Sequence, residues 1–161
     1  MTLIEIESII NRMAKIIDAA KKSLPTYGWS EDFARPHIEV DEEGMHFVVV
    51  ERGKEEFRLT TDDIEKILYR VFSGVCSMMS YEFELKNRDE TKDFRRMAFK
   101  KQEELLGMLN PDWRKEAEER HKDVIFDDNA SLRAKYFQEL REKGLAEAEI
   151  EKIAYEKFPR P

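Results

Sequence analysis

The middle of the chain constrains the fold most, because three short strand candidates there run directly into one long helix candidate. The strand candidates are rich in Val, Ile and Phe, and they read HIEV at 37–40, HFVVVE at 46–51 and EFRL at 56–59. Turn residues around Gly44 and Gly53 separate them, and turns this short join neighbouring strands in antiparallel order. We therefore predict a three-stranded antiparallel meander, which needs helices to cover at least one face.

Helix signals flank the meander on both sides. A T-x-x-E capping box opens at Thr2, and the apolar residues after it predict an amphipathic helix of about 22 residues that ends before Pro25. Thr61, followed by two aspartates, predicts the start of a long central helix that reaches about Arg88. Gly74 inside that helix costs roughly 1 kcal/mol relative to alanine, so we expect another segment to cross closely there.

The remaining chain predicts four more helices. One begins at Asp93, the next is opened by Pro111, and the last two cover residues 132–143 and 147–158. The segment LPTYGW at 24–29 is predicted to be loop. We expect an α+β fold in a single domain, residues 1–161, with an N-terminal helix, the meander, and about five helices packed on a shared core.

The composition favours an intracellular location. Cys76 is the only cysteine, so the chain has no internal disulfide, which fits the reducing cytoplasm. No charged-then-apolar leader is present, and no run approaches the ~18 apolar residues of a membrane span. We expect a soluble cytoplasmic protein that does not bind membranes.

Negative charge is concentrated in the predicted meander. Eleven acidic residues and four basic residues lie between Glu31 and Asp63, a net charge of −7 that equals the net charge of the whole chain. Such a field attracts a basic partner and repels nucleic acid. The alternative is that these acids only keep the hairpin tips solvated. The candidate partner-binding residues are Asp41, Glu42, Glu43, Glu55 and Glu56.

Positive charge gathers between Lys86 and Lys101, with seven basic and three acidic residues. A helix that binds nucleic acid has this charge. However, the region has few aromatic residues for stacking, and the protein as a whole is acidic. We favour a solvated helix face, and we expect no nucleic-acid partner.

No pattern indicates catalysis, a metal or a cofactor. Cys76 has no histidine near it in sequence, so no base would activate its thiol. His37 and Glu39 can share a strand face, but the register of His46 on the next strand is open, and no zinc or calcium motif is present. We assign His37, His46 and His121 structural roles, and we predict no enzyme activity.

One carboxylate on the central helix needs a partner. Glu82 continues the apolar row of Val71, Val75 and Met78 on that helix, and a carboxylate in apolar surroundings must pair with a cation or take up a proton. The candidate cations are Arg52, Arg88, Arg95 and Arg96. Among them we predict a structural ion-pair network in which Glu82 or Glu84 pairs with Arg95 or Arg96 and clamps two helices together.

Several short sequence motifs between Pro36 and Asp128 resemble those of a known family: HFVVVERG, EEFRLT, TTDDIEKILYRVF, YEFELKNR and DFRR. The chain resembles the immunity protein 63 family, small bacterial proteins encoded beside polymorphic toxins and considered to neutralise them. The resemblance implies that the chain binds and blocks one cognate toxin without catalysis, and the acidic surface predicts that this toxin is basic. A non-catalytic regulatory or adaptor protein is the alternative, and an enzyme is the third reading. The identity of the toxin and the oligomeric state stay open.

Overall fold

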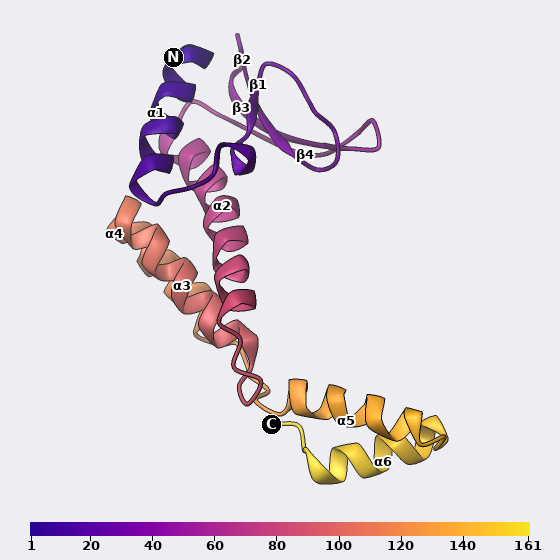
Figure 1. The fold of residues 1–161 in the computed structure, drawn as a ribbon. Helices are drawn as coiled ribbons and strands as arrows, with labels where there is room; N and C mark the ends of the chain where they lie inside the picture. The colour runs from indigo at the N-terminus through magenta and orange to yellow at the C-terminus, as the bar shows by residue number, and fades with distance from the viewer.

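The computed structural model describes all 161 residues. It has the predicted α+β architecture, with a helix and a sheet at one end and five helices after them (Figure 1). In chain order the elements are α1 (Leu3–Ile16), the short 3-10 helix η1 (Lys21–Ser23), β1 (Thr26–Tyr27), β2 (Pro36–Asp41), β3 (Gly44–Glu51), β4 (Lys54–Thr61), α2 (Ile64–Lys86), α3 (Phe94–Leu109), α4 (Pro111–His121), α5 (Ala130–Glu142) and α6 (Glu147–Lys157).

Helix α1 begins as predicted but ends early. The Thr2 hydroxyl accepts a hydrogen bond from the Glu5 backbone N–H at 3.3 Å, and the Glu5 carboxylate accepts one from the Thr2 N–H at 2.7 Å, so the capping box is formed. The helix has 14 residues. It ends because Asp18 takes a left-handed backbone conformation, with φ of 56°, directly after Ile17. The chain then turns through η1 and buries Leu24 in the core.

The sheet has four strands in the order β1-β2-β3-β4. Strands β2, β3 and β4 form the predicted antiparallel meander, with a bulge between Val49 and Val50. The segment predicted to be loop contributes β1, in which Thr26 and Tyr27 pair in parallel with β2. Two residues show no periodicity, so the sequence pattern gave no signal for this strand.

The strand register separates the sheet's side chains into two faces, because directly paired residues point to the same side. Ile38 and Phe47 are paired and belong to the apolar core with α1 and α2. His37, Val48 and Arg58 form the neighbouring row on the opposite face. One face is therefore part of the core, and we call the other face, which carries polar and charged side chains, the outer face.

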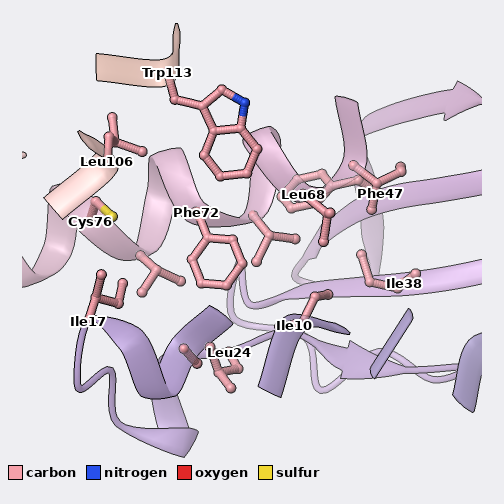
Figure 2. Packing of buried hydrophobic residues seen from close by; sticks show 14 of the residues in the cluster. Ile10, Ile17, Leu24, Ile38, Phe47, Leu68, Phe72, Cys76, Leu106 and Trp113 are labelled. Atoms are coloured by element: carbon pink, nitrogen blue, oxygen red, sulfur yellow. The ribbon is translucent and has the colours of Figure 1, made fainter. Parts of the chain in front are cut away.

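One apolar cluster of 18 buried residues joins α1, the inner sheet face, α2, α3 and α4. Figure 2 shows Phe72 of α2 in the middle of this cluster, with Trp113 of α4 on one side and Leu24 on the other. The rings of Phe72 and Trp113 are stacked, with centroids 6.4 Å apart. Helix α2 is therefore the central element, as the sequence predicted.

The buried row of α2 departs from the predicted one. From Phe72 to Glu84 the fully buried residues include one every four positions, whereas Met78, predicted to be apolar core, is 42% exposed. Each step of four advances about 40° around a helix, so the buried row drifts, and α3 lies obliquely along α2 (Figure 1). The close crossing predicted at Gly74 is wrong, because a Cβ placed there would meet no atom within 4 Å.

Helices α5 and α6 pair with each other and project away from the other elements (Figure 1). Leu140 of α5 and both Ile150 and Ala154 of α6 are buried outside the main core. The rings of Phe137 and Tyr155 meet edge to face, with centroids 5.9 Å apart. These two helices thus have a small apolar cluster of their own, which the predicted single core did not include. No helix of the chain is both long and apolar enough to cross a membrane.

Candidate protein-binding surface

The acidic residues predicted to contact a partner lie at two separate places on the sheet. Asp41, Glu42 and Glu43 belong to the β2–β3 turn, and Glu55 and Glu56 begin β4 after the next turn. All five are exposed. The two turns lie at opposite ends of β3, whose 8 residues span roughly 23 Å. A partner that contacts both groups must therefore extend along the length of β3.

Asp41 is held within its own turn. Its Oδ1 accepts a hydrogen bond from the Glu43 N–H at 2.8 Å and lies 2.9 Å from His46 Nε2. These two bonds, the one with His46 above all, lower the pKa of Asp41. The other nitrogen of His46, Nδ1, lies 2.9 Å from the Thr60 hydroxyl on β4. The turn is thus fixed to the outer face of the sheet, while the carboxylates of Glu42 and Glu43 point to no ion-pair partner.

Glu55 belongs to a row of charged side chains on the outer face. Arg58 donates to Glu55 at 2.8 Å and to Glu39 at 2.9 Å, and Glu39 lies 2.9 Å from His37 Nε2. The bond from Arg58 lowers the pKa of Glu55. Two carboxylates therefore share one guanidinium here.

The predicted clamp between α2 and α3 is not formed. Glu84 is buried, with 1% of its surface exposed, and its two oxygens accept bonds from Arg88 at 2.8 Å, four residues further along the chain and just past the end of α2. Glu82 lies on the exposed side of α2. Arg95 and Arg96 pair with aspartates instead. The sequence pointed to a buried carboxylate on α2, but the predicted cations were wrong because an arginine four residues away reaches it without crossing between helices.

Asp93, which the sequence interpretation missed, is the best-connected carboxylate of the chain. It caps α3, accepts bonds from the Arg95 N–H at 2.9 Å and guanidinium at 2.7 Å, and accepts the Asp127 N–H at 2.7 Å. It is only 3% exposed. Burial raises the pKa of Asp93, but the bonds from Arg95 and from the Asp127 backbone outweigh burial and lower the pKa to about 2. The carboxylate is therefore held in its charged form.

The same network attaches the segment before α5. Arg96 donates to Asp128 at 2.7 Å, and the Asp128 carboxylate also accepts the Asp93 N–H at 2.9 Å. The Arg96 guanidinium lies over the Phe126 ring, 4.3 Å from its centroid. Arg133 of α5 pairs with Asp127. We call this set the Asp93 network; its members are Asp93, Arg95, Arg96, Asp127, Asp128 and Arg133.

The residues weighed for catalysis lie in structural positions. Cys76 is fully buried, and burial raises the pKa of its thiol to about 12. His37 and His46 are buried on the outer sheet face in the contacts described above, and His121 lies 2.7 Å from Glu103 and stacks on Phe99. No three His, Cys, Asp or Glu side chains are grouped as a metal site.

Comparison with known proteins gives one match. The family model described as immunity protein 63 matches residues 41–123. This range is just over half of the 161 residues and runs from the β2–β3 turn to the end of α4. No curated protein and no solved structure matches the chain. The matched range holds both the acidic turns and the start of the Asp93 network, and it leaves out α1 and the α5–α6 hairpin. The chain belongs to the immunity protein 63 family.

Proposed function

We infer that this protein binds a cognate bacterial toxin in the cytoplasm and neutralises it by occupying its surface, without catalysing a reaction. Membership of the immunity protein 63 family is the observation that carries this proposal. The match covers β3, β4 and α2 to α4, which include most of the elements that build the core.

The acidic turns are the first part of the proposed contact surface. Glu42 and Glu43 are exposed and unpaired, and Glu55 and Glu56 lie at the other end of β3. Surface carboxylates that face a basic partner increase the association rate more than the final affinity. The proposed toxin therefore has a basic contact surface, and salt weakens its capture.

Co-expression tests the function. The genes beside this one are searched for a toxin domain, which is expressed in a bacterial host with and without this protein, and growth is measured. The proposal predicts that the protein restores growth and co-purifies with the toxin domain. Growth arrest that persists although both folded proteins are present contradicts it.

A charge reversal tests the acidic contact. Changing Glu42, Glu43, Glu55 and Glu56 to lysine should slow association about tenfold or more at low salt, because electrostatic steering raises association rates by ~10- to 1000-fold. Stopped-flow binding at two salt concentrations measures this effect.

The matched control reverses four exposed acids of the α5–α6 hairpin, Glu139, Glu149, Glu151 and Glu156. It changes the net charge equally, so equal slowing in both variants would show that only the total charge matters. An unchanged association rate in the sheet variant would place the contact elsewhere.

A further inference from the structure

An open hollow lies between α2 and the segment that precedes β2. Its volume is about 300 Å³, and its lining includes Phe33, Phe47, Gly74, Val75 and Met78. Two of these residues are strongly exposed, Phe33 at 87% and Met78 at 42%. Large apolar side chains exposed together around a hollow are typical of surfaces that bind another protein.

Phe33 is exposed on an anchored loop rather than on a loose one. Asp32, Phe33 and Ala34 all have left-handed backbones, with φ of 64°, 53° and 59°. The Ala34 N–H donates to the Val50 carbonyl at 2.9 Å, and Asp32 accepts the Gly53 N–H at 3.1 Å. These bonds to the β3–β4 hairpin hold an unfavourable conformation in place, with the phenyl ring outside the core.

Gly74 forms part of the same hollow and has no packing reason to be glycine. It lies inside α2, where glycine is less favourable than alanine by roughly 1 kcal/mol. A Cβ at this position would meet nothing within 4 Å. The missing side chain therefore leaves the backbone of α2 open to an approach from outside the molecule.

The charged residues that line the hollow are all basic. Lys22, Arg35 and Arg70 contribute to its wall, and no acidic residue does. Arg35 is paired with Glu31, whereas Lys22 and Arg70 have no ion-pair partner. The Arg70 guanidinium is held over the Phe57 ring, 4.6 Å from its centroid. It is thus a positioned, exposed cation beside an apolar surface.

A second hollow continues along α2 with the opposite charge. It shares Lys22 and Met78 with the first and also includes Asp18 and Glu82. Along α2, Arg70 and Glu82 are about 18 Å apart. The resulting groove is cationic at one end, apolar around Gly74, and acidic at the other end.

We propose that this groove binds a segment of the toxin that carries a large apolar side chain and a carboxylate. The apolar side chain lies over Gly74 between Phe33 and Met78, and the carboxylate pairs with Arg70. The proposal rests on the proposed function for the identity of the partner. It adds a contact whose charge is opposite to that of the acidic turns, so the two surfaces recognise different parts of one partner.

A display library of random 12-residue peptides, panned on the intact protein, tests the groove without the toxin. Peptides that combine Asp or Glu with a large apolar residue should be enriched. Binding of a selected peptide should weaken about tenfold or more in Arg70→Glu, as loss of a charge-assisted hydrogen bond implies. The matched control is Arg12→Glu, which reverses an exposed arginine of α1 outside the groove.

Gly74→Phe tests the apolar part, because its ring would fill the hollow without a clash at Cβ. This variant should keep its thermal unfolding midpoint and lose peptide binding. Gly74→Ala adds one methyl group and serves if the larger residue disturbs folding: it should raise the unfolding midpoint, because alanine favours the helix by roughly 1 kcal/mol, and weaken peptide binding. The proposal is contradicted if the peptides bind Gly74→Phe or Arg70→Glu as tightly as the wild type. It is also contradicted if the library yields no peptide with both an acidic and a large apolar residue.

The toxin assay separates this proposal from the proposed function. If wild type, Arg70→Glu and Gly74→Phe all protect cells equally, the groove does not bind the toxin, and the proposed function stands. If the peptides bind the groove as expected while the wild type gives no protection, the groove is a binding site but the toxin is not its partner.

Discussion

The main body and the α5–α6 hairpin are held together by different kinds of contact. The body has one cluster of 18 buried residues drawn from five regions of the chain. The hairpin buries Leu140, Ile150 and Ala154 away from that cluster. Its attachment is polar: Arg133 of α5 pairs with Asp127, and the Asp127 backbone N–H donates to the Asp93 carboxylate at 2.7 Å.

This difference determines which conditions affect each part. Apolar burial is non-directional and spreads over many contacts, so the body depends little on any single polar group. The hairpin depends on a few directional bonds around Asp93, which respond to salt, to pH and to the loss of one side chain. We therefore expect two unfolding units with different sensitivities.

The largest expected effect is in the body. Phe72→Ala should lower the free energy of unfolding by about 3–5 kcal/mol, because it removes a ring at the centre of the core. Urea unfolding followed by the fluorescence of Trp29 and Trp113, both in the body, measures this loss. Leu140→Ala is the matching change in the hairpin, and it should leave the urea midpoint of the tryptophan fluorescence transition unchanged. A shift of the same transition by both variants would show that the molecule unfolds as one unit.

The next effect concerns the attachment. Asp93→Ala leaves Arg95 and the Asp127 N–H without their acceptor, and loss of one partner of a buried ionic group costs about 3 kcal/mol. Amide hydrogen exchange in α5 and α6 should rise more than in α1 or α2. Asp123→Ala removes the same charge from an exposed position and serves as the control. Unchanged exchange in the hairpin would mean that its attachment does not depend on Asp93.

The pH dependence of that attachment follows from the lowered pKa of Asp93. The folded pKa of about 2 lies below the usual 3.8, so the stabilisation is complete above pH 4 and is lost as the pH falls toward 2. The stability difference between wild type and Asp93→Asn should shrink by about 2 kcal/mol between pH 6 and pH 2. Urea unfolding of both proteins at the two pH values tests this. A difference that stays constant would contradict a charged, hydrogen-bonded Asp93.

The smallest effect belongs to the surface pair of the network. Arg96 and Asp128 are both about half exposed, and such pairs contribute about 0–1 kcal/mol. Arg96→Ala should therefore raise hydrogen exchange in the hairpin only slightly, and Arg96→Lys less, with both effects reduced in high salt. A loss as large as that of Asp93→Ala would assign Arg96 a central role in the attachment.

Local signals in the sequence predicted local structure well. The capping box at Thr2, the turns that separate the β2–β4 strands, and the Asn110–Pro111 start of α4 all act within a few residues, and all are present. The family assignment was also predicted, from short sequence motifs in the same region.

Contacts between segments far apart in the sequence could not be predicted from such local signals. Asp93 and Asp127 are 34 residues apart, and nothing in the spacing of either residue points to the other. Glu84 rather than Glu82 is the buried carboxylate because the buried row of α2 drifts around the helix where α3 packs obliquely. The pairing of Thr26 with β2 likewise depends on the finished sheet. Whether the acidic turns contact a toxin stays a prediction.

The position of Asp93 also has a consequence for the order of folding. Its Oδ1 is oriented by the Arg95 N–H in the first turn of α3, and only then is its Oδ2 placed to receive the Asp127 N–H. The strands of the meander close short loops, which form quickly, whereas this bond must wait for a helix end to exist. We expect the hairpin to dock as a late and separate kinetic step, after the body has reached its native packing.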